Sequence, residues 1–457
     1  MVAVDLRAEL LALVPDEARV TTSESALEGH GQDLTYNARH DPDVVVYATT
    51  TDEVSKVVAL ANEQRIPVTP FGAGTSLEGG IIPLDGGISL DLSRMDRILE
   101  LRAEDMHAVV QPGVRRSQLE HAAGEHGLWF PVDPGADATL GGMASTGASG
   151  TTTVRYGAMR QQVLGLEVVL ANGDVIRTGS RAVKSSAGYN LTGLFVGAEG
   201  TLGVITELTL RLYGIPDYVV AVRAAFPSLE AACDAAAQMA AAGIMLTRCE
   251  LVDSSSILSM NLFGGTDYPA TPHLWLEFSG SSETSIAGDL ETARELAEAE
   301  GCEAFQSETD ATARARLWEA RHNSLLAAMA RAPGMRAYAT DVCVPVSQLP
   351  DAFRVGRKLL EECGLAGGIV GHVGDGNYHI GFLLDPGDEE MIAKAKQLNA
   401  GIVEDALARG GTCTGEHGVG IGKKPFLEQE HGDTLPLMRG IKSLLDPNGI
   451  LNPGKVV

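Results

Sequence analysis

The hydrophobic positions of the first half of the chain alternate between strand-like and helix-like spacing. The apolar run Val44–Ala48 predicts a strand, and the segment after it repeats apolar residues at helical intervals, with Thr51 or Asp52 able to cap it. Residues 164–180 form two β-rich runs joined by Asn172–Gly173, a dipeptide that favours a tight hairpin turn. This mixture predicts an α+β protein.

From about residue 217 the pattern changes. Strand-like and helix-like segments follow in the order β-α-β-β-α, which predicts a ferredoxin-like antiparallel sheet. Residues 311–332 have helical spacing, and residues 339–349 ("ATDVCVPVSQL") resemble a strand. Two further predicted helices flank a histidine-containing strand.

Length and charge limit the function. A chain of 457 residues is long enough for two or three domains. A formal net charge of -25 disfavours nucleic acid and anionic membrane surfaces as partners. A site for an anionic substrate must therefore be built from local arginine, lysine or metal.

The sequence also predicts a cytoplasmic location. It holds no apolar run of membrane-spanning length, and its first twenty residues lack the pattern of a secretory or transit peptide. Its six cysteines have no CxxC spacing and are expected to be reduced thiols.

Three glycine-rich segments are candidates for ligand binding. In residues 70–80 ("PFGAGTSLEGG"), Leu77 replaces the third glycine of a GxGxxG motif, and a strand follows instead of a helix, so a Rossmann site is disfavoured. The segment is either an ordinary turn or an anion-binding nest. Residues 133–150 and 196–206 are similarly poor in large side chains, which suits a long cofactor lying against the backbone.

A candidate metal site lies in "GHVGDGNYHI" (residues 371–380). In one continuous strand His372 and His379 would face opposite sides, but Gly374 and Gly376 allow a bulge or a turn that brings them together. Glu416 offers a carboxylate, and two imidazoles with one carboxylate leave open positions on a divalent ion. The alternative is a polar turn with solvated histidines.

A histidine and the arginines of one predicted helix are further candidates for catalysis or substrate binding. His417 either supports the metal site or acts as a general base, since imidazole titrates near neutral pH. Arg314 and Arg321 share one face of a predicted helix and Arg316 lies off it; such arginines are either solvated or available to bind a carboxylate.

Seven segments in this order resemble the vanillyl-alcohol oxidase type of FAD-linked oxidases, in the branch of D-lactate dehydrogenases and glycolate oxidase flavoprotein subunits. The likeness covers roughly residues 40–457. The segments are "PFGAGTSLEGG", "DPGADATLGGMASTGASG", "GAEGTLGVIT", "TDVCVPVSQLP", "GHVGDGNYH", "GTCTGEHGVGIGK" and "LDPNGILNPGK".

The resemblance implies a two-subdomain FAD-binding domain with a ferredoxin-like cap. Residues 1–216 would be the FAD-binding domain, residues 217–415 the cap or substrate domain, and residues 416–457 a C-terminal segment that returns to the FAD domain. Since residues 70–80 contain no histidine, the FAD is expected to be non-covalent.

The resemblance also implies which residues bind the FAD. The pyrophosphate would lie on Gly72, Ala73, Gly74, Thr75 and Ser76. The isoalloxazine and ribityl parts would contact Pro134, Gly135, Thr139, Gly142, Ser145, Thr146 and Gly150. The adenine end would contact Glu199, Gly200 and Ile205, and Asn452 would approach the flavin from the C-terminus.

For the chemistry, the resemblance implies His372, His379 and Glu416 as ligands of Zn²⁺, Mn²⁺ or Fe²⁺, with Asn377 beside them. Arg321, in a Trp-x-x-Arg context, would hold the carboxylate of a D-2-hydroxy acid. The general base would be His417, which takes the hydroxyl proton as hydride passes to flavin N5.

The resemblance implies D-lactate, oxidised to pyruvate, as the expected substrate, because "TDVCVP" and "GTCTGEHG" look most like the segments of D-lactate dehydrogenases. Relatives that oxidise D-2-hydroxyglutarate have a lysine where this chain has Ala339, although Arg336 is near in sequence. The alternatives are a glycolate oxidase flavoprotein subunit, a D-2-hydroxyglutarate dehydrogenase and a non-redox enzyme like alkyl-glycerone-phosphate synthase. The electron acceptor remains open between a cytochrome, a quinone, an electron-transfer flavoprotein and O₂, and the oligomeric state is open, with a homodimer among the alternatives.

Overall fold

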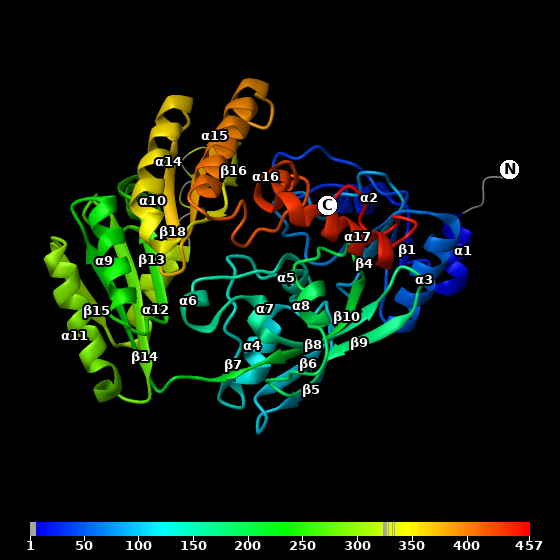
Figure 1. Ribbon diagram of the computed structural model, residues 1–457, viewed down its shortest axis with the longest axis horizontal. Helices are drawn as coiled ribbons and strands as arrows, with labels where there is room; N and C mark the ends of the chain where they lie inside the picture. The colour runs from blue at the N-terminus through cyan, green and yellow to red at the C-terminus, as the bar shows by residue number, and fades with distance from the viewer. Residues whose placement is uncertain (1–5, 323–326, 328, 331, 333) are drawn as a thin grey trace. The chain divides into compact units, whose positions relative to one another are not determined.

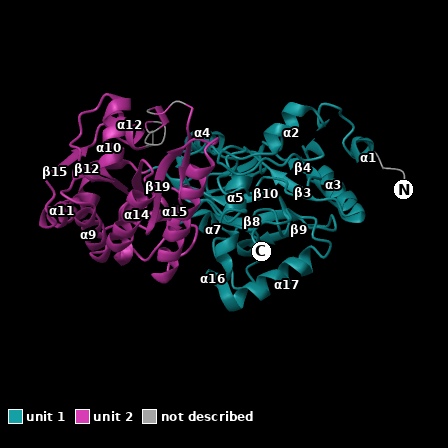
Figure 2. Cartoon of the chain, turned by 90° about the horizontal axis from the view of Figure 1, so that it is seen from above, with its two compact units in different colours: residues 1–149, 157–215, 416–457 teal, residues 150–156, 216–415 magenta. Residues whose placement is uncertain are grey.

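The computed structural model describes residues 6–457 except 323–326, 328, 331 and 333 (Figure 1). Its contacts divide the chain into two units (Figure 2). Unit 1 consists of residues 1–149, 157–215 and 416–457, and unit 2 consists of residues 150–156 and 216–415. The short excursion of residues 150–156 into unit 2 is not indicated by the sequence pattern.

Unit 1 is built on two main sheets. The first has the order β1-β2-β4-β3 and pairs β4 in parallel with both β2 and β3. The second is antiparallel, with the order β5-β6-β10-β8-β9. A further short pair joins β7 and β11. The strands are β1 Val20–Thr21, β2 Val44–Tyr47, β3 Val68–Phe71, β4 Ile88–Asp91, β5 Ile98–Arg102, β6 His107–Val110, β7 Leu128–Trp129, β8 Val163–Val169, β9 Val175–Gly179, β10 Val204–Arg211 and β11 Tyr213–Gly214.

Several helices of unit 1 pack on these sheets. The helix predicted after the first strand is α3, Thr51–Gln64. Its N-cap is Thr50, whose hydroxyl accepts a hydrogen bond from the Glu53 N–H. The prediction that Thr51 or Asp52 caps this helix is therefore wrong. The predicted hairpin of β8 and β9 is confirmed, and Gly173 has φ +86 in its turn. The other helices are α1 Leu6–Leu13, α2 Glu24–His30, α4 Arg116–Gly124, α5 Leu140–Thr146, α7 Met159–Gln162, α8 Leu191–Phe195, η2 Lys424–Phe426, α16 Leu427–His431, η3 Gly432–Thr434 and α17 Leu435–Leu445.

Unit 2 is built on one antiparallel sheet of the order β15-β12-β14-β13-β18-β19-β16, with β17 paired to β19. Its first four strands have the ferredoxin-like order that the sequence predicts. The sequence pattern missed α10, which lies between β13 and β14. The strands are β12 Tyr218–Ala225, β13 Arg248–Val252, β14 His273–Gly280, β15 Ala304–Glu308, β16 Arg336–Ala339, β17 Val342–Cys343, β18 Gly367–His372 and β19 Asn377–Leu384.

The two faces of this sheet differ. Helices α9, α11, α14 and α15 lie along one side of unit 2 in Figure 2, and α10 and α12 lie along the other. On the α10 and α12 side, a small apolar cluster contains Trp275 and Trp318. Glu250, which is opposite Trp275 in the sheet, lies on the same face. The helices are α6 Thr153–Tyr156, α9 Leu229–Ala241, α10 Ser254–Gly264, α11 Glu283–Ala299, α12 Ala311–His322, η1 Val346–Gln348, α14 Leu349–Cys363 and α15 Glu389–Ala408.

One predicted strand of unit 2 is wrong, and one predicted helix lies partly outside the described residues. Residues 339–349 are not one strand: β16 ends at Ala339, β17 covers two residues, and the η1 turn begins after Pro345, which cannot donate a backbone hydrogen bond. The helix predicted for residues 311–332 is described only to His322, and part of the remainder lies outside the described residues.

The structure describes the state of the cysteines and the length and apolar character of the helices. All six cysteines lie among the described residues and are free thiols. Within the described part of the chain, no helix has both the length and the apolar character needed to span a bilayer.

Candidate active site

The histidine-containing segment is a hairpin of β18 and β19 that turns through residues 373–376. Gly376 makes this turn possible, because its φ is +92 and a Cβ there would meet the Val344 carbonyl oxygen at 2.0 Å. In the hairpin His379 is opposite Val370, and Asn377 is opposite His372. Since alternate residues share a face, His372, Asn377 and His379 all point to one side of the sheet. A turn, and not a bulge, therefore brings the two imidazoles together.

Each imidazole is held through its Nδ1 atom. The His372 Nδ1 lies 2.7 Å from Glu250 Oε1, and the His379 Nδ1 lies 2.8 Å from the Thr340 carbonyl oxygen. Because these oxygens accept hydrogen bonds, both rings carry a proton on Nδ1, and the neutral form of each ring has its lone pair on Nε2. The ring centroids are 5.5 Å apart. This is the tautomer that a metal-binding imidazole requires.

Asn377 presents an unsatisfied oxygen beside these rings. Its Nδ2 donates to Asp341 Oδ1 at 2.8 Å and to the Val342 carbonyl at 2.9 Å, which fixes the orientation of the amide. Within the described residues its Oδ1 is buried and has no hydrogen-bond partner. A buried oxygen left in this state needs a donor or a cation from a ligand.

Asp341 connects the hairpin to the segment that carries Glu416. Its Oδ2 accepts hydrogen bonds from the Thr414 hydroxyl at 2.6 Å and the Gly415 N–H at 2.8 Å. Glu416 is the next residue in the chain and the first of the C-terminal part of unit 1. In unit 1 its Oε2 accepts from the Ser149 hydroxyl at 2.8 Å.

Arg321 is anchored on a protein carboxylate. Its Nη2 donates to Glu250 Oε2 at 2.6 Å, and its side chain is almost fully buried. Its Nε is buried without a hydrogen-bond partner among the described residues. Arg314, seven residues earlier on α12, instead donates to the Val219 carbonyl at 3.0 Å, which is a structural role.

His417 lies in unit 1 next to a different buried carboxylate. Its Nδ1 is 3.9 Å from Glu78 Oε1, and Lys423 Nζ is at the same distance from that oxygen. The Glu78 carbonyl accepts from the Ile421 and Gly422 N–H groups. The loop after His417 is therefore fastened to the first glycine-rich segment.

The glycine-rich segments of unit 1 meet one another. A Cβ on Gly72 would lie 2.5 Å from Thr139 Oγ1, so these loops touch only because residue 72 is glycine. Thr139 caps α5 by accepting from the Gly142 N–H, and the Ser145 carbonyl accepts from the Glu199 N–H. Their bare, convergent backbone fits a cofactor that lies along it.

Glu199 and Asn452 join these segments to the C-terminus. The Asn452 side chain donates to the carbonyls of Gly80 and Glu199 at 2.9 and 2.7 Å. The Glu199 carboxylate accepts from the Val419 and Gly420 N–H groups. Gly200 has φ +71 and packs on a proline of β3. Five stretches distant in sequence thus meet at Glu199.

The other residues that were predicted to bind FAD lie in several different loops and elements. Ala73, Gly74, Thr75 and Ser76 form a half-buried loop after β3, and Thr146 bonds back to its own helix α5. Pro134 and Gly135 lie in a partly exposed loop. Gly150 belongs to unit 2, and Ile205 is buried in the core of unit 1, opposite Val168.

Burial raises the pKa of the Glu199 carboxyl from 4.5 to about 7, and the pKa of Lys455 is lowered to about 8 by its own burial. A raised carboxyl pKa means that the folded state binds more protons than the unfolded state between pH 4.5 and 7, so stability falls as pH rises through this range. The full difference corresponds to about 3 kcal/mol.

Glu199→Gln should therefore gain stability relative to the wild type as pH rises. The difference in unfolding free energy, variant minus wild type, is expected to grow by about 1–3 kcal/mol between pH 5 and 7.5. Denaturant unfolding of both flavin-loaded proteins at several pH values measures it. Glu207→Gln, on β10, controls for the loss of one carboxylate. If the difference in unfolding free energy between Glu199→Gln and the wild type stays constant with pH, the pKa of Glu199 is not raised in the folded protein.

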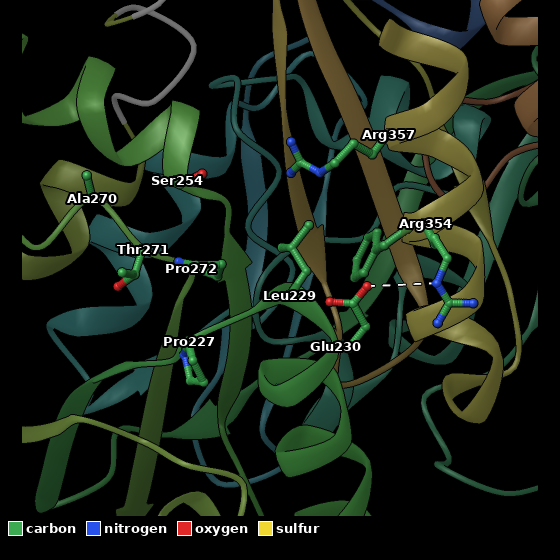
Figure 3. Close-up of a pocket in the computed structure, with 10 residues that line it drawn as sticks. Pro227, Leu229, Glu230, Ser254, Ala270, Thr271, Pro272, Arg354 and Arg357 are labelled. Atoms are coloured by element: carbon green, nitrogen blue, oxygen red, sulfur yellow. Dashed lines mark ion pairs between the residues drawn. The ribbon is translucent and has the colours of Figure 1, made fainter. Parts of the chain in front are cut away.

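A separate cavity of about 320 Å³ lies in unit 2 (Figure 3). Its lining includes Arg354 and Arg357 of α14 and Glu230 of α9. Figure 3 shows Arg354 directed to Glu230, and their charged atoms are 3.9 Å apart. None of the residues predicted to bind cofactor, metal or substrate lines this cavity.

Sequence reasoning missed two carboxylates that organise the site, Glu250 and Asp341. Both are fully buried inside strand-like segments, in "RCELVD" and "ATDVCVP". The available signal was an acidic residue with apolar residues on both sides in a strand-like segment, because a buried charge requires a partner elsewhere in the fold.

Comparisons with known proteins agree with this picture. Residues 215–456 match the model described as FAD linked oxidases, C-terminal domain, and residues 42–179 match an FAD binding domain. The "Probable D-lactate dehydrogenase, mitochondrial" of Danio rerio is 45% identical over 448 residues, which cover 97% of this chain and 90% of that protein. The "D-lactate dehydrogenase [cytochrome], mitochondrial" of Arabidopsis thaliana is 41% identical over 454 residues, with 99% and 80% covered.

Among solved structures, p-cresol methylhydroxylase with substrate bound is similar, with a TM-score of 0.80 at 19% identity, covering 98% of this chain and 96% of that one. At this identity the likeness concerns the fold alone. It confirms the predicted class, a two-subdomain FAD-binding fold with a second antiparallel domain.

Proposed function

Since this chain belongs to the family of FAD-linked oxidases, we propose that it is an FAD- and metal-dependent dehydrogenase that oxidises D-lactate to pyruvate. The observation that carries the proposal is the buried polar cluster on one face of the unit 2 sheet. There His372 and His379 are fixed as Nδ1-H tautomers, and the Asn377 Oδ1 lacks a partner among the described residues.

We propose that Gly72, Thr139, Ser145, Glu199 and Asn452 belong to the binding surface of a non-covalent FAD. Their loops converge, and side chains at the glycine positions would block the approach of another backbone or of a ligand. FAD would accept the hydride equivalent that leaves Cα of the hydroxy acid.

We propose His372, His379 and Glu416 as ligands of a divalent ion, with the Asn377 Oδ1 directed at the ion or at the substrate hydroxyl. Two imidazoles and a carboxylate suit Zn²⁺, Mn²⁺ and Fe²⁺ alike. Such an ion would lower the pKa of the substrate hydroxyl. The ligand atoms of the two histidines are oriented by acceptors on strands and loops of unit 2, which favours a rigid site.

Two residues would act on the substrate directly. Arg321 binds the substrate carboxylate through N–H groups other than the one bound to Glu250, and so fixes the position of this end of the substrate. His417 accepts the hydroxyl proton, and the nearby Glu78 carboxylate stabilises the imidazolium that results.

The sheet register favours a monocarboxylate over D-2-hydroxyglutarate. Ala339 is opposite Gly381, so it lies on the same face as His379 and offers no charge for a second carboxylate. Arg336 is three residues earlier, opposite Leu384, and therefore points to the other face of the sheet. Its nearness in sequence does not bring it to the histidines.

For the electron acceptor we propose a cytochrome, by analogy with the Arabidopsis relative. A cytoplasmic location stays a prediction from the N-terminal sequence, and it contrasts with the relatives that are named mitochondrial.

A visible spectrum of the purified protein under anaerobic conditions tests the function. D-Lactate is expected to bleach the oxidised flavin band, and L-lactate, the stereochemical control, is expected to leave it unchanged. Acid precipitation should release the flavin into the supernatant if it is non-covalent. A flavin band that D-lactate does not bleach would reject D-lactate as substrate, and a folded protein without flavin would reject the cofactor.

A further inference from the structure

Glu250 is a buried carboxylate in the middle of β13 that none of the proposed roles uses. It has no exposed surface, and its neighbours along the strand are apolar. Strand pairing places it on the face that carries His372: Val252 is opposite Val370, and alternate residues share a face. Glu250 thus lies directly beside the hairpin.

The two carboxylate oxygens of Glu250 hold two different partners. Oε1 is 2.7 Å from His372 Nδ1, and Oε2 is 2.6 Å from Arg321 Nη2. Burying a carboxylate in a sheet is unfavourable unless a charge and hydrogen bonds compensate it. Arg321 supplies the charge, and the imidazole N–H supplies a further bond. Arg321, Glu250 and His372 are therefore linked by hydrogen bonds in which the guanidinium compensates the charge of the carboxylate.

We propose that Glu250 is a positioning residue that holds His372 in the metal-binding tautomer, with Arg321 as its counter-charge. A carboxylate that accepts the Nδ1 proton keeps the lone pair on Nε2, prevents ring rotation and raises the basicity of Nε2 as a ligand. This inference rests on the proposed metal site, and it gives Arg321 a task besides substrate binding.

The contrast between the two histidines supports this assignment. The Nδ1 of His379 donates to a neutral backbone carbonyl, and the Asp341 carboxylate lies farther away, at 3.8 Å, whereas the Nδ1 of His372 donates directly to a carboxylate. A charged acceptor makes a stronger hydrogen bond than a neutral one and increases electron density on the ring more. His372 would therefore be the stronger of the two imidazole ligands, and Glu250 is the cause.

The test is the affinity of the flavin-loaded protein for Mn²⁺ and Zn²⁺, measured by titration without substrate. In Glu250→Gln the amide oxygen replaces only one of the two carboxylate oxygens, and the NH₂ group that replaces the other cannot accept from the second donor. The dissociation constant of the metal is expected to rise about 10–100-fold. Glu250→Asp retains the buried charge but is one carbon shorter, so it cannot reach both partners, and the same direction of change is expected.

Glu277→Gln is the matched control. Glu277 is a buried carboxylate on neighbouring β14, 3.1 Å from the Arg248 guanidinium, so this variant also breaks a carboxylate–arginine pair. It is expected to lose stability while keeping the metal affinity of the wild type. Unchanged affinity in both Glu250 variants, or an equal loss in Glu277→Gln, would overturn the positioning role. A wild type that binds no divalent metal would instead refute the proposed metal site itself.

Discussion

Replacing His417 with glutamine is expected to lower the rate of flavin reduction by D-lactate about 10²–10⁴-fold. Hydride can leave Cα only as the hydroxyl loses its proton, and imidazole is the side chain with the proton affinity to accept it near neutral pH. Glutamine preserves the size and polarity of the side chain but cannot accept a proton. The Glu78 carboxylate, 3.9 Å from the ring, would then stabilise no imidazolium.

Anaerobic stopped-flow reduction of the bound flavin measures this step apart from reoxidation by the acceptor. His431→Gln, at a half-exposed histidine of α16 in the same unit, is the matched control and should keep the wild-type rate. Flavin and metal contents of both variants must equal those of the wild type. A His417→Gln protein that reduces its flavin at full rate would show that another group takes the proton.

Arg321→Lys is expected to raise the KM for D-lactate about 100-fold. The guanidinium is anchored at Nη2 by Glu250, which fixes the plane in which its other N–H groups lie. Lysine keeps the positive charge that compensates the buried Glu250 carboxylate, but it offers no planar pair of N–H donors for the substrate carboxylate. Each charge-assisted hydrogen bond contributes about 1.5–3 kcal/mol, and the loss of one or two accounts for the expected change.

The conservative variant is essential here, because Arg321→Ala would leave the Glu250 carboxylate buried without its counter-charge and would destabilise the fold. Arg316→Lys, at an exposed arginine of the same helix, is the control. The dissociation constant of pyruvate, followed through the flavin spectrum, should rise in parallel with KM. An unchanged pyruvate affinity in Arg321→Lys would remove this residue from substrate binding.

Much of the fold could be predicted because it depends on local patterns. The β8–β9 hairpin follows from Asn172–Gly173, whose glycine adopts the positive φ that the turn needs. The ferredoxin-like order of β12 to β15 follows from alternating apolar segments. Helix α10 was missed because its apolar residues lack a clear face. The strand predicted for residues 339–349 breaks at Thr340 and Asp341, which bind His379 and Gly415, and it ends before Pro345.

The candidate site was only partly accessible to such reasoning. The sequence predicts that His372 and His379 converge if Gly374 and Gly376 form either a bulge or a turn. The choice between them depends on the pairing of β18 with β19 and on the close approach of Gly376 to Val344. Neither contact can be read from residue types.

By itself, the sequence determined the residue types available for chemistry, the glycine-rich segments and the family resemblance. These depend on motifs whose members lie within a few residues of one another. Only the tertiary structure decided that Glu250 holds both Arg321 and His372, 71 and 122 residues away, and that Arg336 faces away from His379. Such pairings are set by strand register and by the compensation of buried charge, which act between segments distant in the chain.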